Sequence, residues 1–367
     1  MFIGNRWSVS HERLEIPKKC VPKKNVFFLK NHKCGSDTVQ NILLRYGDNN
    51  NLTFLIPKHG TSFWNPVNKP FSRERVKKLP WTILGDFNIF CVHVRFDAHE
   101  LHAVMPPDSV YIAIVREPIS HFESTYNYFS LYKKYHVTLR DFSLMNKTQL
   151  LRKKIGFRER NPQLYDFGIN GTYIQDTGFF QREIKKLDKI FDFVMITELM
   201  EESLVLLKNL MCWELKDVAT FRKNVRSDTW RENDLSWKER VGIKTWNFGD
   251  DLLYKYFRNK FEKKLSEFGL DNMQREIKQL RQINNQIFLE CVSNMEASST
   301  LPRPLKHGSD KVLGYRLKPG KERNLNCLQM ARVSTSYVGY LKKKQYRWVR
   351  EKYKINTNRT LSNINLK

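Results

Sequence analysis

Residues 26–47 read Val26-Phe-Phe-Leu-Lys-Asn-His-Lys-Cys-Gly35-Ser-Asp-Thr-Val-Gln-Asn-Ile-Leu-Leu-Arg-Tyr-Gly47, and this stretch decides the fold. Its first four residues form an apolar run of the kind found in buried strands, and a polar turn around Gly35 follows. Apolar residues then recur at the i, i+3, i+4 and i+7 spacing of one helix face, which predicts a helix. These residues are Val39, Ile42, Leu43 and Tyr46. We expect Ser36 or Asp37 to cap the start of this helix and Gly47 to end it.

A strand, a small-residue turn and a helix in this order aim backbone N–H groups and the positive end of the helix at an anion. Lys33 lies in the turn and adds a full positive charge. The hydroxyl groups of Ser36 and Thr38 can donate further hydrogen bonds. The stretch therefore predicts a phosphate-binding loop. The alternative, which the turn alone leaves open, is an ordinary strand–turn–helix unit with a solvated lysine.

This loop differs from the loop that binds nucleoside triphosphates. That motif is Gly-x4-Gly-Lys-[Ser/Thr], in which the lysine follows the last glycine and a hydroxyl group binds magnesium. Here Lys33 precedes Gly35, and the triphosphate motif occurs nowhere in the chain. A P-loop-like nucleotide kinase is therefore disfavoured, although magnesium-dependent ATP binding would support that alternative.

The chain has 367 residues, enough for one large α/β domain or two smaller ones. Its 41% hydrophobic and 13% aromatic content is typical of a globular protein. The formal net charge of +26 favours anionic partners: nucleic acid, acidic membrane surfaces, or phosphorylated and sulfated small molecules. A basic RNA-binding protein is a second alternative, but the chain has no recognisable RNA-binding signature, and we predict no nucleic-acid partner.

The six cysteines include no Cys-x-x-Cys pair and no histidine partner at zinc-site spacing, so we predict no metal site. Their even number allows disulfides, but the sequence leaves the pairing open. No apolar run approaches the roughly 18 residues of a membrane span, and residues 1–20 lack the apolar core of a signal peptide. We therefore expect any membrane anchor to lie outside this sequence.

The rest of the chain alternates predicted strands and helices. Ile89–Phe96 has the composition of a strand, with His93 inside it, and Val110–Val115 is the strongest buried-strand pattern. Pro118 suits the first turn of a following helix, and Phe191–Ile196 predicts another strand. This alternation predicts an α/β fold with a central parallel sheet flanked by helices.

The C-terminal part is predicted to be helical, with an amphipathic helix at Met200–Trp213 and two or more helices across 250–295. Aromatic and basic residues alternate in 340–353, which suits a helix lying on an anionic bilayer. The alternative is a helix that packs Trp348 against the domain. The expected divisions are a lead-in or stem remnant at 1–24, one domain at 25–335, and a basic, aromatic, partly disordered tail at 336–367.

A second anion site is predicted where Val110–Val115 ends, because ligands of open α/β sheets bind at the carboxyl ends of the strands. Arg116 emerges there, and Ser124 lies about two helical turns further on. An arginine fork and a serine hydroxyl group can hold a second phosphate. The alternative is that Arg116 pairs with Glu117 or Glu123 on the surface.

Two segments carry a resemblance to a known family. Leu29–Thr38 is similar to the 5′-phosphosulfate loop of Golgi carbohydrate sulfotransferases, and Val115–Ser124 is similar to their 3′-phosphate segment. Further stretches, in the expected order over roughly residues 25–330, resemble the galactose 3-O-sulfotransferase family. These stretches are Asn41–Gly47, Asn51–Phe54, Val92–Phe96, Glu201–Val218 and Leu313–Leu317.

This resemblance implies a P-loop-like sulfotransferase that uses 3′-phosphoadenosine 5′-phosphosulfate (PAPS) as sulfuryl donor and needs no metal. The implied acceptor is the 3-hydroxyl of a terminal galactose, on a galactosylceramide-like glycolipid or on a glycoprotein glycan. The implied location is the Golgi lumen, in association with the membrane, and a membrane surface is a possible partner. The acceptor pocket itself cannot be predicted from the sequence.

The resemblance also implies roles for individual residues. The 5′-phosphosulfate loop comprises Lys33, Cys34, Gly35, Ser36, Asp37 and Thr38, and the 3′-phosphate pair comprises Arg116 and Ser124. Lys33 suits the stabilisation of charge on the leaving phosphate oxygen. His93 falls where related enzymes carry a likely base, and a neutral histidine suits that task near pH 7. A structural role is the alternative for His93, and His32 is the reserve candidate.

Two departures from the family pattern lie in this loop. Cys34 and Gly35 replace the more usual Thr-Ala, which still suits a tight turn. Asp37 replaces a serine and places a carboxylate close to the anion site. A carboxylate that faces the site would repel the donor, whereas one that faces outward would only cap the helix.

Overall fold

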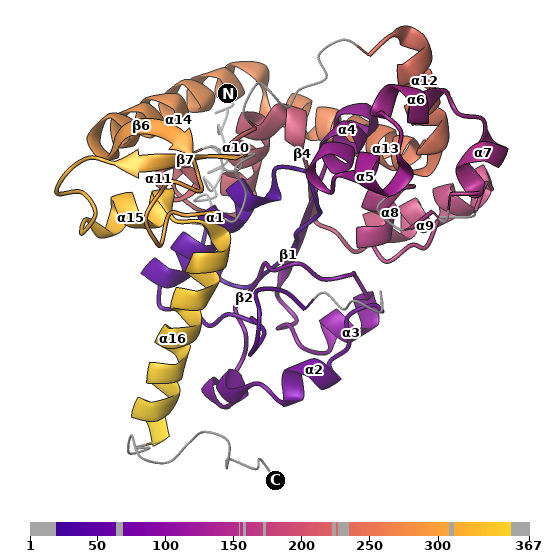
Figure 1. Cartoon of the computed structure of the whole chain (residues 1–367). Coiled ribbons are helices and arrows are strands. Elements are labelled where there is room, and N and C mark those ends of the chain that lie inside the picture. The colour runs from indigo at the N-terminus through magenta and orange to yellow at the C-terminus, as the bar shows by residue number, and fades with distance from the viewer. Residues whose placement is uncertain are drawn as a thin grey trace, which may run out of the picture.

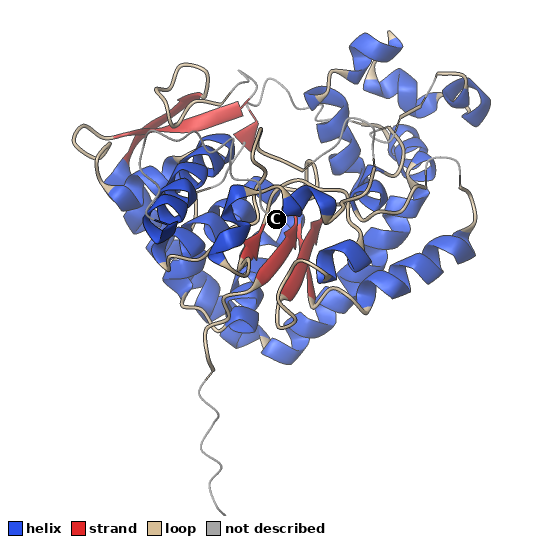
Figure 2. Ribbon diagram, turned by 90° about the horizontal axis from the view of Figure 1, so that it is seen from below, coloured by secondary structure: helices blue, strands red, loops and turns tan. Residues whose placement is uncertain are grey.

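A four-stranded parallel sheet lies at the centre of the protein, with helices on both faces (Figure 1, Figure 2). This computed structural model describes residues 20–63, 69–153, 155–156, 159–171, 174–221, 225–226, 235–307 and 312–353. The strands are β1 (Val26–Leu29), β2 (Ile89–Phe90), β3 (Val110–Val115) and β4 (Phe193–Ile196). Their order is β2-β1-β3-β4, each neighbouring pair is parallel, and every strand residue is buried. The predicted α/β fold is confirmed.

Helices from both halves of the chain surround this sheet. The longer helices are α1 (Ser36–Asn49), α4 (Pro118–Tyr128), α9 (Thr177–Asp188), α10 (Met200–Met211), α12 (Trp237–Trp246), α13 (Phe248–Phe268), α14 (Leu270–Cys291) and α16 (Ser334–Tyr353). The shorter ones are α2 (Glu74–Lys77), α3 (Ala98–His102), α5 (Leu131–Tyr135), α6 (Leu139–Leu144), α7 (Lys147–Leu151), α8 (Pro162–Asp166), α11 (Leu215–Val218), α15 (Leu325–Ala331) and the 3-10 turns η1 (Pro80–Leu84) and η2 (Thr197–Leu199). The predicted helices at 200–213 and 250–295 are therefore present.

The strands at β1 and β3 have the predicted bounds, and β4 begins two residues later than predicted. The predicted strand over Ile89–Phe96 is wrong beyond Phe90, where β2 ends. β2 lies at the edge of the sheet and pairs with only the first two residues of β1. Further along, the His93 carbonyl accepts a hydrogen bond from the backbone N–H of Phe63, which lies in a loop (3.0 Å). His93 therefore lies in a segment beyond the end of the strand.

Helix α1 starts differently from the prediction. Gly35 precedes it in the left-handed conformation (φ 69°), and no side chain caps the helix start. The Ser36 hydroxyl group instead donates to the Asn31 carbonyl (2.6 Å), and the Asp37 carboxylate binds the ammonium group of Lys30 (2.9 Å). Both side chains thus organise the turn before the helix, because the backbone at Gly35 already makes the sharp change of direction.

The predicted helix stop at Gly47 is also wrong. Helix α1 continues through Gly47 and ends at Asn49. A Cβ atom added at Gly47 would overlap the ring of Phe54, so this glycine allows the loop after α1 to pack closely against the helix. The glycine serves close packing here and does not provide a left-handed cap.

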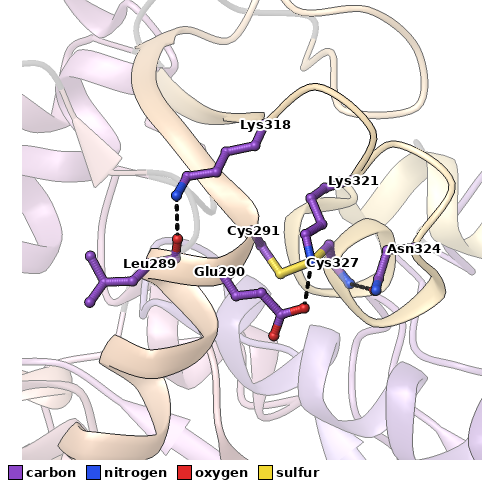
Figure 3. Close-up of a disulfide and its surroundings, with 7 residues drawn as sticks. All are labelled: Leu289, Glu290, Cys291, Lys318, Lys321, Asn324 and Cys327. Atoms are coloured by element: carbon purple, nitrogen blue, oxygen red, sulfur yellow. Dashed lines mark hydrogen bonds and ion pairs between the residues drawn. A yellow bond between two sulfur atoms is a disulfide. The ribbon is translucent and has the colours of Figure 1, made fainter.

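A second, smaller sheet is antiparallel and was not predicted. Its strands β5 (Val225–Arg226), β7 (Val312–Leu317) and β6 (Val292–Ala297) lie in the order β5-β7-β6. The Cys291–Cys327 disulfide joins the end of α14 to α15 beside this sheet (Figure 3). Figure 3 also shows Lys318 donating to the Leu289 carbonyl (2.6 Å), which holds the end of β7 against α14.

A second disulfide fixes the start of the described chain. Cys20 is bonded to Cys212, directly after α10, and the backbone N–H of Lys23 donates to the Met211 carbonyl (2.9 Å). The last residues of the predicted lead-in at 1–24 are therefore attached to the main body, and residues 1–19 lie outside the described residues. The two cysteines outside the disulfides, Cys34 and Cys91, are buried.

Helix α16 packs along the main body, as the yellow helix in Figure 1 shows. Its apolar face joins the same core as the parallel sheet, through Tyr337, Val338, Leu341 and Val349. Gln345 is buried and bonds both the backbone N–H (2.6 Å) and the carbonyl (3.3 Å) of Phe54. Helix α16 therefore packs on the main core with one face, and residues 354–367 of the predicted tail at 336–367 lie outside the described residues.

Candidate active site

A cavity of about 1390 Å³ opens where β1 and β3 end, and it extends to the antiparallel sheet. The predicted site residues that line it are Lys33, Gly35, Ser36, Asp37, Thr38, His93, Arg116 and Ser124. The side chain of Cys34 is fully buried and its thiol donates to the Gln163 amide oxygen (3.4 Å). The fold thus brings both predicted anion sites and the predicted base to one cavity.

The loop between β1 and α1 has the shape of an anion cradle. The backbone of Lys33 and Gly35 is left-handed, with φ angles of 58° and 69°. The Lys33 ammonium group lies 3.5 Å from the ring centre of Tyr128, so a cation–π contact from α4 positions this charge. Thr197 donates its hydroxyl hydrogen bond to the Cys34 carbonyl (2.8 Å) and fastens the loop to the end of β4.

Arg116 lies beside this loop. Its guanidinium group donates to the Lys33 carbonyl (3.0 Å), which directly connects the two predicted phosphate sites. The Gln163 side chain fixes the arginine backbone from both sides, because it accepts from the N–H (2.8 Å) and donates to the carbonyl (2.9 Å). Ser124 is buried in α4 and also lines the cavity.

Lys30 is a site residue that sequence reasoning missed. It follows β1 directly, its side chain is only 6% exposed, and it lines the cavity. Its ammonium group lies 2.9 Å from a carboxylate oxygen of Asp37 and 3.0 Å from Nε2 of His93. A lysine at the carboxyl end of a central parallel strand was the available signal, since ligands of such sheets bind there.

Asp37 takes neither of the two orientations considered from the sequence. Its carboxylate lines the cavity but also binds Lys30 and accepts from the Ser334 hydroxyl group (2.8 Å). Burial works to raise the pKa of Asp37, but the charge and hydrogen bond of Lys30, with smaller contributions from Ser334 and Lys33, lower it to about 2. Asp37 is therefore ionised and neutralises a buried lysine.

The His93 ring has a defined tautomer. Its Nδ1 lies 2.8 Å from the Lys30 carbonyl, which can only accept, so Nδ1 carries the hydrogen. Nε2 then carries the lone pair and accepts from the Lys30 ammonium group. Burial, followed by the electrostatic effects of the neighbouring His32 and Lys30, holds the pKa of His93 well below its ordinary value, so the ring is neutral near pH 7.

His32 stacks on His93, with ring centres 4.0 Å apart and ring planes 13° apart. Its Nδ1 lies 3.0 Å from a carboxylate oxygen of Asp166, and its backbone N–H donates to the same oxygen (2.7 Å). Buried His121 donates from Nε2 to the His32 carbonyl (2.8 Å), and burial is the main reason why its pKa falls to about 3. Asp166 and Gln163 were missed because residues 133–190 have no clear periodicity.

The far end of the cavity has an aromatic wall. The rings of Phe221, Phe288 and Tyr315 contact one another, with centres 5.0–6.1 Å apart. Asn284 on α14 also lines this end, and its side-chain oxygen accepts from the backbone N–H of Thr220 (2.8 Å). The acceptor or the base of a nucleotide can use such a surface, which was not predicted from the sequence.

Two chemical features of the lining residues indicate which kind of ligand the cavity can bind. Within the described ranges, no group of three or more His, Cys, Asp and Glu side chains lies close enough together to hold a metal ion. Lys30, Lys33 and Arg116 instead line the cavity, together with Ser36, Thr38 and Ser124, and Arg116 contacts the Lys33 carbonyl directly. This arrangement suits a ligand with two separate anionic groups.

Comparison with known proteins points to one family. The family model described as galactose-3-O-sulfotransferase matches residues 8–345. Galactosylceramide sulfotransferase from Homo sapiens is 30% identical over 338 residues, which cover 87% of this chain and 78% of that protein. Galactose-3-O-sulfotransferase 2 from Mus musculus is 27% identical over 352 residues, which cover 91% of this chain and 89% of that protein.

Galactose-3-O-sulfotransferase 3 from Mus musculus is 30% identical over 342 residues, which cover 88% of this chain and 78% of that protein. A solved sulfotransferase from Alicyclobacillus acidocaldarius is 14% identical and covers 65% of this chain and 97% of its own, but the TM-score of 0.37 is too low to add to the argument. The family model and the relatives with 30% identity each match most of the chain. The chain belongs to the galactose-3-O-sulfotransferase family.

Proposed function

We propose that this sulfotransferase moves a sulfuryl group from PAPS to the 3-hydroxyl of a terminal galactose. The main support for the proposal is the hydrogen bond from Arg116 to the Lys33 carbonyl. It places the two predicted phosphate-binding sites next to each other in one cavity. PAPS has two separate anionic ends, a 5′-phosphosulfate and a 3′-phosphate. The donor therefore fits the residues that are present.

The loop residues have distinct tasks in binding this donor. Lys33 and Thr38, with the backbone N–H groups of Ser36 and its neighbours at the start of α1, would bind the 5′-phosphosulfate, because the Ser36 hydroxyl group already donates to the Asn31 carbonyl. The left-handed Gly35 shapes this turn, and its missing side chain leaves room beside Met200, whose terminal carbon would lie 3.3 Å from an added Cβ. Cys34 would contribute through its backbone, because its side chain is buried. Asp37 would influence donor binding through its ion pair with Lys30, whose charge it neutralises.

The 3′-phosphate would be held by the Arg116 guanidinium group and the Ser124 hydroxyl group. Gln163 holds the Arg116 backbone, and the Lys33 carbonyl accepts from the guanidinium group, so the side chain is already partly ordered before binding. The aromatic wall at Phe221 then leaves an apolar surface for either the adenine base or the acceptor.

Transfer forms a bond between the galactose oxygen and sulfur and breaks the bond between sulfur and the 5′-phosphate oxygen. The electron pair of the broken bond stays on that oxygen, where Lys33 can stabilise the charge. The transition state is loose, so positioning and charge stabilisation do most of the work. The galactose hydroxyl group must lose a proton, and His93 and its stacked neighbour His32 are the two candidates to accept it.

The acceptor class and the compartment are part of the same proposal. A relative is named galactosylceramide sulfotransferase, and others are named galactose-3-O-sulfotransferases, which supports a galactose-terminated glycolipid or glycan as acceptor. The two disulfides support an oxidising compartment such as the Golgi lumen. In the part of the chain that the structure describes, no helix is long and apolar enough to span a membrane. Association with a membrane surface belongs to the same proposal, since the named acceptor of one relative is a membrane lipid.

The test has two stages. Adenosine 3′,5′-bisphosphate, the spent donor, should raise the melting temperature at micromolar concentration, and adenosine 5′-monophosphate should raise it far less. Purified protein with labelled PAPS should then sulfate a β-galactoside and leave a 3-deoxygalactoside unlabelled. Stabilisation by ATP only with magnesium would favour a kinase, and failure to discriminate between the two galactosides would refute the 3-hydroxyl assignment.

A further inference from the structure

The short helix α8 connects the two halves of the proposed site. Gln163 and Asp166 lie three residues apart on it, so they share one face of the helix. Gln163 holds the backbone of Arg116, and Asp166 holds His32. One five-residue element thereby positions both a donor-binding residue and a candidate proton acceptor.

Helix α8 is itself held rigidly from α13. The Asp250 carboxylate accepts from the backbone N–H groups of Gln163 (3.0 Å) and Leu164 (2.9 Å). The side-chain oxygen of Asn161, directly before α8, accepts from the N–H groups of Gly249 and Asp250. All these groups are buried, so α8 has little freedom to move relative to the core.

The contact between Asp166 and His32 fixes the histidine tautomer. Asp166 is only 3% exposed, and both of its oxygens lie within 3.1 Å of Nδ1 of His32. An ionised carboxylate can only accept hydrogen bonds, so Nδ1 carries the hydrogen and Nε2 carries the lone pair of the neutral ring. The backbone N–H of His32 donates to the same carboxylate, so Asp166 holds both the main chain and the side chain of His32.

His32 is better placed than His93 to take up a proton, because its ring contacts a carboxylate and the ring of His93 contacts an ammonium group. Nε2 of His93 accepts from the Lys30 ammonium group at 3.0 Å, and Asp37 holds that lysine in place. A galactose hydroxyl group would have to displace Lys30 to reach His93. His32 lines the same cavity, and the Asp166 carboxylate favours a positive charge on its ring, whereas the Lys30 charge opposes one on His93.

We infer that Asp166 is a positioning residue for sulfuryl transfer: it fixes His32 so that Nε2 accepts the proton of the galactose hydroxyl group. This inference rests on the proposed function. As the galactose oxygen bonds to sulfur, its proton moves to Nε2, and the electron pair of the breaking bond moves to the 5′-phosphate oxygen. The imidazolium that forms faces the Asp166 carboxylate, which stabilises it.

The experiment separates turnover from donor binding. Asp166→Asn keeps the shape but removes the charge that stabilises the imidazolium and brings in an N–H donor that competes for Nδ1, so kcat should fall by about 10²- to 10⁴-fold. The Kd for adenosine 3′,5′-bisphosphate should stay within about threefold, since no donor contact is lost. Gln163→Ala should do the opposite and mainly weaken the bisphosphate. Asp188→Asn is the matched control, because it removes a surface partner of Lys260 away from the cavity and should leave both quantities unchanged.

A double-mutant cycle tests whether Asp166 acts through His32. His32→Ala should lower kcat as much as Asp166→Asn, and the double variant should be no slower than either single variant. Losses that multiply would overturn the inference. So would an Asp166→Asn kcat within threefold of wild type, or a loss of bisphosphate binding parallel to the loss of turnover.

A measurement on the unmodified protein covers the case in which Asp166→Asn does not fold. NMR of 15N-histidine-labelled protein should show His32 with its hydrogen on Nδ1, the signal being assigned by its loss in His32→Ala. A hydrogen on Nε2 would overturn the inference. Wild-type protein that shows this tautomer but transfers no sulfuryl group to any galactoside would refute the proposed function instead.

Discussion

The ion pair between Asp37 and Lys30 can be tested with the isosteric change Asp37→Asn. The pKa of Asp37 falls from its ordinary 3.8 to about 2, against the opposing effect of burial. This difference corresponds to about 2 kcal/mol of stability at neutral pH. Lys30, only 6% exposed, would also lose its charged partner, so we expect Asp37→Asn to be destabilised by at least that amount at pH 7.

The pH dependence follows from the sign of this shift. A carboxyl group with a lowered pKa in the folded protein stabilises it fully above the unfolded pKa of about 3.9. The contribution is lost as the pH falls through about 2. The stability difference between wild type and Asp37→Asn should therefore be largest above pH 5 and shrink below pH 4. Urea unfolding at several pH values measures it.

The same change should tighten donor binding. A like charge about 6 Å from the phosphosulfate costs roughly 1–3 kcal/mol at an effective dielectric constant of 20–40. Removing it also leaves the Lys30 charge unneutralised, so adenosine 3′,5′-bisphosphate should bind roughly 5- to 100-fold more tightly in calorimetry. Ser334→Ala is the matched control, because it removes one hydrogen bond to Asp37, costs about 1 kcal/mol of stability and keeps the charge.

Two results would refute this reasoning. Unchanged stability of Asp37→Asn at pH 7 would mean that the ion pair with Lys30 contributes nothing. Weaker bisphosphate binding would mean that the carboxylate assists the donor, by holding Lys30 where the donor needs it.

The remaining predictions concern the donor site and the metal requirement. Lys33→Ala should abolish transfer from PAPS, and substantial turnover in this variant would remove the lysine from its proposed role. Arg116→Ala should weaken the bisphosphate by roughly 1.5–3 kcal/mol and adenosine 5′-monophosphate hardly at all, and calorimetry that finds equal losses for both would disprove the 3′-phosphate assignment. Activity should survive EDTA in a radiolabel transfer assay, and loss of bisphosphate binding on chelation would favour the kinase alternative.

The buried parts of the fold were the most predictable from sequence. β1 and β3 consist entirely of apolar residues and have the predicted bounds, because strands buried on both faces leave an uninterrupted apolar run. β6 and β7 were missed because they are partly exposed and carry polar residues, and β6 directly continues the helical pattern of α14. The end of β2 depended on its partner strand, which its own sequence does not reveal.

The candidate site was predictable where one segment carries the chemistry. The loop from Lys33 to Thr38 and the pair Arg116 and Ser124 could be located from local pattern and resemblance, and all but the buried Cys34 line one cavity. Asp166 could not, since its importance comes from tertiary contacts, and the position of Lys30 directly after β1 was a signal whose contacts with Asp37 and His93 only the fold reveals. Asp166 lies 134 residues from His32 in the sequence, and no spacing rule connects the two.

The Cys20–Cys212 disulfide has a topological consequence. The two cysteines are 192 residues apart, and all four strands of the parallel sheet lie between them. The sheet is thus enclosed in a covalent ring, which by chain entropy alone contributes roughly 5 kcal/mol against unfolding. A protease that cuts any loop within the ring releases no fragment until the disulfide is reduced, so nicked protein keeps its full mass under oxidising conditions and both anion-binding segments stay attached to the same molecule.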